Sequence, residues 1–482
     1  MFRQASRLFS RSIAAGSYKS ATARAFSTEV LLTTDRRLWS HGRKSHREAS
    51  SVDCLFMKPR PLTASSIPTK LTSISSSLRK MMSRVGRVGK MRTLSEPESE
   101  KLQCFLERNL PLHRAPVIES FRLQMCNSHF KPESISTWVV VALSHCLREL
   151  DILYEPYPAK PNILPSNLYK CKSLVVLKLD GEILLNVPRM VSLPSLKTLE
   201  LHEVKYSKDE TLQRLLSNCP LLEDLVVYLR ERDTTTRNLT VVVVPSLQRL
   251  TLYIPNNYEL YEYVIDTPSL KYFELVDYNY YDHYGLIENM PYLIEAYVDS
   301  SCPGIYSLIY SVTSVKRLTI CSEVNHFFIY QLILCNKLSV TLLSSAQAIL
   351  NCLVFNELEH LEVCLCTVLF SNQLVRLLKA CSNLKRLDIS LMDDHDPHQD
   401  MDDWNEPSTV PECLLSSLQS LSWSKYTREP QERDIMGYIL KHAVYLKTAT
   451  IKSSESDVQK LEMIKELALS SRASKTCQLM FE

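Results

Sequence analysis

Cysteine and histidine are the residues best suited to metal or redox chemistry, and the chain contains 15 cysteines and 12 histidines. Zinc sites are usually built from ligand pairs about two to four residues apart. No Cys-x-x-Cys pair occurs here, and the tightest pair is Cys364-x-Cys366. The odd number and scattered positions of the cysteines are typical of reduced, mostly buried thiols in a cytosolic, nuclear or mitochondrial-matrix protein. We therefore predict no metal site and no disulfide framework.

Residues 393–403 (DDHDPHQDMDD) concentrate acidic side chains around His395 and His398. Calcium loops require a turn glycine and a bidentate glutamate at fixed positions, and the segment contains neither residue type. Metal binding is one interpretation of this composition. A solvated acidic linker between two parts of the chain is the simpler one, and we predict the linker.

Glycine is scarce, since the chain has only 8. Phosphate-binding loops, dinucleotide-binding turns and the nucleophile elbow of hydrolases need several glycines close together. After residue 90 the glycines are widely spaced, at Gly181, Gly285, Gly304 and Gly437, which excludes these motifs. No Ser/His/Asp set has a supporting sequence context. We predict a protein that is not an enzyme, with no catalytic residues and no cofactor.

Tyrosines are concentrated between residues 258 and 292. They are Tyr258, Tyr261, Tyr263, Tyr272, Tyr278, Tyr280, Tyr281, Tyr284 and Tyr292. Exposed tyrosines make good protein-contact surfaces. Packing along strand edges is the alternative, above all for Tyr272. Acidic residues such as Asp277 and Asp282 lie among them and disfavour a nucleic-acid surface.

Charge divides the chain into a basic first part and an acidic remainder. Residues 1–93 contain 19 basic and 4 acidic residues, whereas the rest contains 37 basic and 49 acidic ones. Nucleic-acid binding requires clustered Lys and Arg, so we expect no nucleic-acid partner. No apolar run approaches the roughly 18 residues of a membrane span, and we predict no membrane partner.

Residues 1–30 are rich in Arg, Ser and Ala and contain no acid before Glu29. Amphipathic, Arg-rich, acid-poor leaders are typical of mitochondrial transit peptides. We interpret 1–30 as a transit peptide, with a disordered basic tail as the alternative, and 31–100 as a disordered basic Ser/Arg-rich linker. The predicted location is mitochondrial if the leader is genuine, and otherwise cytoplasm or nucleus.

One motif, apolar-x-x-apolar-x-apolar, recurs from residue 116 onward. The matching triplets are Ile118/Phe121/Leu123, Leu147/Leu150/Ile152, Leu174/Leu177/Leu179, Leu196/Leu199/Leu201, Leu222/Leu225/Val227, Leu247/Leu250/Leu252, Leu270/Phe273/Leu275, Leu293/Ala296/Val298, Val315/Leu318/Ile320, Leu358/Leu361/Val363, Leu384/Leu387/Ile389, Leu418/Leu421/Trp423 and Leu446/Ala449/Ile451. Between Leu174 and Val315 the units begin 22 to 26 residues apart, and the interval after Val315 leaves room for a degenerate unit near Leu338.

A period of about 20–29 residues carrying this motif is the signature of leucine-rich repeats, whose units must stack because one unit cannot bury its apolar face. We predict an α/β fold over 101–400: an irregular leucine-rich-repeat solenoid, with a curved parallel sheet and short helices or loops as returns. Residues 209–218 and 371–380 have the periodicity of helical returns, whereas 256–264 does not. Cys171, Cys219 and Cys381 end such returns, and we interpret them as small core residues.

The C-terminal sequence carries a more specific pattern in 410–418 (VPECLLSSL), 438–443 (YILKHA) and 474–479 (SKTCQL). With 105–108 (FLER) and 112–117 (LHRAPV) ahead of the repeats, it resembles the plant F-box proteins that have leucine-rich repeats and a C-terminal FBD domain. The resemblance covers 101–482 and implies an FBD domain at 405–482.

The same resemblance implies a substrate-recognition subunit of a cullin-type ubiquitin ligase, in which an F-box docks on the Skp adaptor. No segment of 1–100 resembles an F-box, because Trp39 lacks the apolar helix that should precede it. We therefore predict a non-catalytic protein-interaction protein that binds an unidentified protein partner through its curved strand face, without an evident adaptor-docking module. The alternative is a mitochondrial assembly factor or enzyme that uses the repeat as a scaffold.

Overall fold

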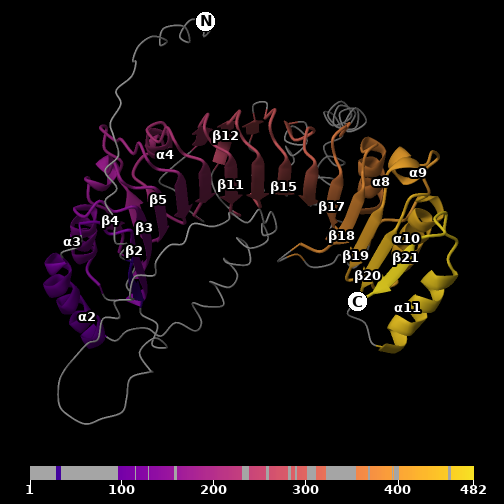
Figure 1. Ribbon diagram of the computed structural model, residues 1–482, viewed down its shortest axis with the longest axis horizontal. Helices are drawn as coiled ribbons and strands as arrows, with labels where there is room; N and C mark the ends of the chain where they lie inside the picture. Colours follow the sequence, from indigo (N-terminus) through magenta and orange to yellow (C-terminus); the bar gives the residue numbers. More distant parts are fainter. Residues whose placement is uncertain are drawn as a thin grey trace, which may run out of the picture.

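The computed structural model forms an arch in which a long parallel sheet lines the inner side (Figure 1). It describes residues 29–33, 96–113, 116–128, 130–156, 160–230, 238–256, 260–279, 284–287, 290–300, 311–321, 354–366, 370–392, 395, 401–453 and 457–482. The interpretations of 1–100 therefore lie outside the described residues, except for the strand Glu29–Thr33 and the start of the helix Glu96–Asn109. The degenerate unit near Leu338 lies outside them too.

Over the described residues the main sheet has 15 strands, and every pair of neighbours is parallel. In spatial order they are β1 (Glu29–Thr33), β2 (Ser120–Ser128), β3 (Glu149–Pro156), β5 (Val176–Gly181), β7 (Thr198–His202), β9 (Asp224–Tyr228), β11 (Arg249–Ile254), β13 (Tyr272–Asp277), β15 (Glu295–Ser300), β16 (Arg317–Cys321), β17 (His360–Cys364), β18 (Arg386–Ser390), β19 (Ser420–Ser424), β20 (Thr448–Lys452) and β21 (Gln478–Phe481). Each strand of the repeat pairs with the strand of the next unit, as the predicted solenoid requires.

The thirteen apolar triplets form the core. None of their side chains is more than 3% exposed. The register places equivalent positions side by side, so that Leu177 of β5 lies between Leu150 of β3 and Leu199 of β7. Truncating a leucine in such a site removes about 2–5 kcal/mol of stability. The predicted repeat fold is confirmed.

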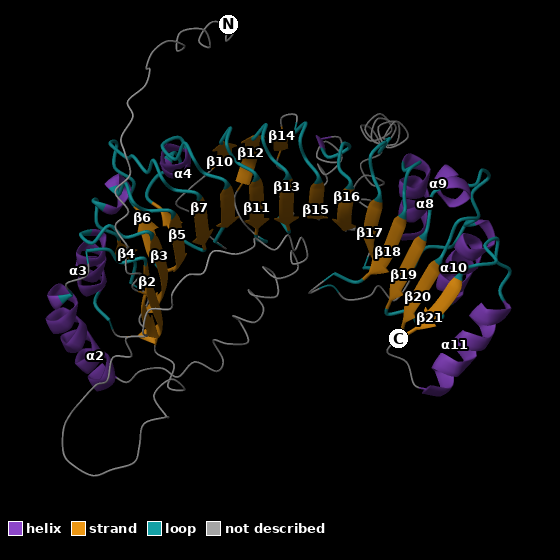
Figure 2. Cartoon of the chain, viewed as in Figure 1, coloured by secondary structure: helices purple, strands orange, loops and turns teal. Residues whose placement is uncertain are grey.

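The outer side of the arch carries helices in some units and short strands in others (Figure 2). The helices are α2 (Glu96–Asn109), α3 (Pro132–Leu143), α4 (Thr211–Leu216), α8 (Phe370–Ala380), α9 (Glu412–Ser416), α10 (Pro430–His442) and α11 (Asp457–Leu469), with 3-10 turns η2 (Leu110–Leu112) and η3 (Leu168–Lys170). The predictions of helical returns in 209–218 and 371–380 are confirmed by α4 and α8.

Two small parallel sheets complete the outer side. They are formed by β4 (Asn162–Ile163), β6 (Ile183–Leu185) and β8 (Lys205–Tyr206), and by β10 (Asn238–Val243), β12 (Leu260–Asp266) and β14 (Tyr284–Ile287). The repeat motif does not predict these strands. The return 256–264 lacks a helical period because β12 occupies part of it.

Serine hydroxyls tie successive units together at the turns that precede the strands. The hydroxyls of Ser173, Ser246 and Ser474 each donate to a carbonyl oxygen of the preceding unit, at 2.6–2.8 Å. The acceptors are the first leucines of the motif, Leu147, Leu222 and Leu446. Serine side chains thus satisfy backbone groups in turns that contain no glycine.

The sheet continues without interruption into the C-terminal segment. β18 pairs with β19, and β19 with β20, in the same register as the earlier units. The C-terminal residues therefore add further units to the solenoid rather than a separate core, and one hydrophobic cluster includes both Leu387 and Leu421. Among the described residues, no helix is sufficiently long and apolar to cross a membrane.

Gly181, at the end of β5, is the glycine on which the fold depends most directly. Its φ is +89°, and a Cβ atom there would lie 2.5 Å from the carbonyl oxygen of Tyr154. We expect Gly181→Ala to lower the free energy of unfolding by roughly 2 kcal/mol or more, measured by urea denaturation. Gly437→Ala is the matched control, because nothing lies within 4 Å of its Cβ position in α10.

The control should raise stability by about 0.5–1 kcal/mol, because alanine is the better helix former. Equal effects of the two substitutions would contradict the role of Gly181.

Candidate functional site

The side chains that alternate with the buried ones point away from the core and form the inner face of the arch. In each central repeat strand they occupy the first, third and fifth positions, as Thr198, Glu200 and His202 do in β7. Because the strands are in register, each position forms a column that crosses the sheet. We call these positions the inner face.

The first column includes ion pairs between neighbouring strands. Arg249 Nε lies 2.7 Å from Asp224 Oδ1, and Arg317 Nε lies 3.0 Å from Glu295 Oε2. The Arg249 side chain is nevertheless 65% exposed. Pairs this accessible contribute at most about 1 kcal/mol, so their main effect is to hold charged groups in fixed places.

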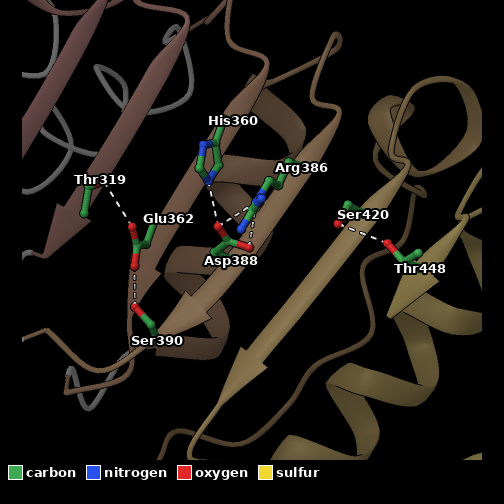
Figure 3. A network of polar contacts seen from close by, with 8 residues as sticks. All are labelled: Thr319, His360, Glu362, Arg386, Asp388, Ser390, Ser420 and Thr448. Atoms are coloured by element: carbon green, nitrogen blue, oxygen red, sulfur yellow. Dashed lines mark hydrogen bonds and ion pairs between the residues drawn. The ribbon is translucent and has the colours of Figure 1, made fainter. Parts of the chain in front are cut away.

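Polar contacts continue across the C-terminal half of the inner face (Figure 3). Arg386 Nε and His360 Nε2 lie 2.8 Å and 2.7 Å from the same Asp388 oxygen. Burial disfavours ionisation of Asp388, but these hydrogen bonds outweigh it and lower its pKa. One strand away, Glu362 accepts hydrogen bonds from Thr319 and Ser390 at 3.3 and 2.7 Å.

Two carboxyl groups of the middle column lie in opposite environments. Glu200 accepts a hydrogen bond from Lys178 Nζ at 2.6 Å, and His202 Nε2 lies 3.9 Å away. Burial opposes ionisation of Glu200, but His202 and Lys178 outweigh it and lower the pKa to about 2. Glu274 is 2% exposed, and burial raises its pKa although Tyr272 and Thr251 donate hydrogen bonds to it.

An aromatic row runs along the carboxyl ends of the strands. The rings of His202 and Tyr228 stack at 4.6 Å, and those of Tyr228 and Tyr253 at 5.2 Å. Tyr253 contacts Tyr278 edge-on at 5.9 Å, and Tyr278 lies 6.2 Å from His395. The row links neighbouring repeats at the carboxyl ends of their strands, and Tyr228 within it is only 2% exposed.

His395 is 91% buried, since its side chain is only 9% exposed. The prediction of a solvated linker is therefore wrong for this residue. It is also wrong for Asp402, whose carboxylate accepts hydrogen bonds from the backbone N–H groups of Ser371 and Asn372 at the start of α8. His395 and Asp402 therefore both contact the repeat units, one as a nearly buried ring and the other as an acceptor at the start of α8.

His395 lies beside Cys321, Cys364 and Cys366. The potential ligand atoms of these four side chains all lie within 4.8 Å of one another. These are the residues of the described chain that could hold a metal. The prediction of no metal site rests on the absence of any Cys-x-x-Cys pair, with Cys364-x-Cys366 as the tightest pair in the sequence. The signal that could have found Cys321 is its place in the repeat, since it directly follows the motif and ends its strand as Cys364 does.

Other predicted residues are distributed over the fold. Tyr263 and Tyr272 are buried, Tyr278 belongs to the aromatic row, and Tyr292 is 67% exposed. The side chains of the remaining tyrosines of 258–292 lie outside the described residues. Cys219 and Cys381 are buried, as the core interpretation predicts, while Cys171 is half-buried.

A parallel repeat sheet with a polar inner face and a core of buried leucines defines a leucine-rich-repeat protein. Comparisons with protein families agree. The FBD family matches residues 406–451, and the family described as the LRR repeats of an FBD-associated F-box protein matches residues 135–286.

Curated relatives place the chain more narrowly. An FBD-associated F-box protein of Arabidopsis thaliana is 55% identical over 388 residues, which are 80% of this chain and 87% of the relative. A second FBD-associated F-box protein of that plant is 46% identical over 77% of this chain and 85% of the relative. An F-box/FBD/LRR-repeat protein is 43% identical over 79% and 82%. The chain belongs to the family of FBD-associated F-box proteins with leucine-rich repeats.

The lowered pKa of Glu200 predicts a loss of stability in acid. A group whose pKa is lowered by folding stabilises the protein above its unfolded pKa of about 4.5, and this contribution is lost as the pH falls from there toward about 2. Glu200→Gln should remove on the order of 2 kcal/mol of this dependence, measured as urea midpoints from pH 7 down to 3. Glu357→Gln, in an exposed turn, should leave the profile unchanged, and an unchanged profile for Glu200→Gln would contradict the prediction.

The raised pKa of Glu274 predicts the opposite slope. A carboxyl group whose pKa is raised by folding stabilises the protein below its usual pKa, and this contribution is lost as the pH rises through the folded pKa. Glu274→Gln retains an acceptor for Tyr272 and Thr251 without a charge. We expect it to raise the thermal midpoint at pH 8 relative to the wild type and to have little effect at pH 4. A drop at pH 8 would mean that the ionised carboxylate is required.

Proposed function

We propose that this protein is a non-catalytic recognition protein that binds a protein partner on the inner face of its arch. The observation that carries the proposal is the inner face itself. Charged groups held by ion pairs, among them two exposed arginines, lie there on a parallel sheet beside a packed row of aromatic rings. Arginine and tyrosine in rigid positions are favourable binding groups, because little side-chain entropy is lost when they make contact.

The charges on the inner face favour a partner surface that carries charges of both signs. Arg249 and Arg386 are 65% and 54% exposed while remaining hydrogen-bonded to Asp224 and Asp388. Each arginine therefore keeps donors available to a partner carboxylate in a defined direction. Such complementary charges set the orientation and rate of association more than its strength.

The relatives support a finer proposal, because they are named as F-box proteins. We propose that the bound partner is a substrate for ubiquitin transfer and that the chain acts as its recognition subunit. The alternative of a mitochondrial scaffold rests on residues 1–30 alone and stays a prediction.

The experiment compares the partners of three full-length chains in plant cells by proximity labelling under proteasome inhibition. The test variant is Arg249→Glu with Arg386→Glu, and the control is Lys465→Glu on α11, a side chain that is 60% exposed on a terminal helix. We expect the test variant to lose specific partners at least tenfold, because each reversal places like charges side by side on the inner face. The control should retain them.

Equal labelling by all three chains would contradict recognition through the inner face. The Skp adaptor is scored in the same samples. Its recovery with every chain supports a ligase subunit, whereas partner recovery without the adaptor refutes the ligase role and leaves the recognition role standing.

A further inference from the structure

Four metal-ligating side chains converge at the carboxyl ends of β16 and β17. Cys321 and Cys364 end these two strands, Cys366 lies two residues further on, and His395 follows β18. The Nδ1 atom of His395 lies 3.1 Å from Cys366 Sγ, 3.4 Å from Cys364 Sγ and 3.5 Å from Cys321 Sγ. One ring nitrogen therefore faces all three sulfur atoms.

These separations match the coordination sphere of a small soft cation. Tetrahedral zinc, with Zn–S of about 2.3 Å and Zn–N of about 2.0–2.1 Å, separates its ligand atoms by roughly 3.5–3.8 Å. Cys321 Sγ and Cys366 Sγ are 3.1 Å apart, which is well beyond the roughly 2.05 Å of a disulfide. Shifts of a few tenths of an ångström would bring the set to the metal-bound geometry.

The second nitrogen of His395 is held by a carboxylate. Asp299 Oδ2 lies 3.1 Å from His395 Nε2, and the Tyr278 hydroxyl donates to the same oxygen at 2.9 Å. Histidines that bind metals nearly always donate their other N–H group to such a partner, which fixes the ring and its tautomer. The backbone N–H of Met392 also points to Cys364 Sγ, at 3.4 Å.

We propose that Cys321, Cys364, Cys366 and His395 bind one Zn²⁺ ion as a structural site. Three thiols and one imidazole form a closed tetrahedral set, and thiolate ligands select zinc over calcium or magnesium. The three cysteines are buried and the His395 side chain is only 9% exposed, so no coordination position opens to substrate. On binding, the three thiols lose their protons to solvent and the neutral imidazole coordinates through Nδ1.

The site would fasten the segment after β18 across the ends of β15, β16 and β17. It would also fix both ends of the long stretch between Cys321 and Cys364, because the two cysteines would share one ion. The loop-closure entropy of that stretch is then compensated by metal–ligand bonds. The aromatic row ends at the same histidine, so the ion would also hold the last ring of the inner face in place.

The experiment measures zinc in the purified full-length chain under reducing conditions, by elemental analysis and by cobalt substitution. We expect one zinc per chain, and visible cobalt bands typical of a tetrahedral thiolate site. The double variant Cys364→Ser/Cys366→Ser should lose both signals. Cys104→Ser/Cys146→Ser is the matched control, since these two cysteines are exposed and remote in sequence from the cluster, and it should retain one zinc.

A second variant keeps the test decisive if the double variant does not fold. Asp299→Asn retains all four ligands and alters only the partner of His395, so zinc affinity should fall about 10–100-fold in competition with a chelator. The proposal is overturned if the folded wild type binds no zinc, if the double variant retains its zinc, if iron is found in place of zinc, or if Cys321 and Cys366 are joined by a disulfide.

Discussion

The in-register pairing of parallel strands is the constraint on which the rest of this structure depends. A strand has a side-chain period of two, so a shift of one residue between neighbours would turn every core leucine outward. Here Leu150, Leu177 and Leu199 lie in one column inside the sheet. The same register must then place every outward residue beside its equivalent in the next unit. The core and the inner face are two consequences of one alignment.

That alignment explains why chemically useful groups meet although they are distant in the sequence. Asp299, Cys321 and Cys364 are all fifth residues of successive strands, so they form one column at the carboxyl edge of the sheet. Glu362 bridges Thr319 and Ser390 by the same geometry. A solenoid thus assembles a polar cluster by repeating one position, whereas a compact domain does so by bringing loops together.

The thirteen strands that carry an apolar triplet could be predicted from the sequence, because each triplet is a local pattern and each unit repeats it. Helical returns could be predicted only where the return has its own period, as in α4 and α8. The strands β10, β12 and β14 escaped prediction because they are stabilised by each other, across units, rather than by a local signal. The predicted FBD domain begins at residue 405, but the main sheet continues from β18 before this boundary to β19 after it.

The cluster around His395 could not be predicted from ligand spacing, because spacing rules describe metal sites built within one loop or hairpin. In a repeat the relevant measure is the position within the unit. By that measure Cys321 and Cys364 are adjacent although 42 residues lie between them in the sequence. His395 is different, since it lies beyond a strand in a segment whose acidic composition indicates solvent exposure. His395 can be buried because three thiols and Asp299 supply the polar contacts that water would supply at the surface.

Helices cover both ends of the stack of repeats. A stack of identical units would expose a leucine core at each terminus, and repeat proteins need a differing unit to cover it. At one end Leu106 of α2 and Leu110 of η2 are buried in the common core, and at the other Met463 and Leu467 of α11 are buried there. The helices at both ends turn polar residues outward, as Glu107 and Lys465 do. Both ends of the stack are thus covered by helices whose outer faces are polar.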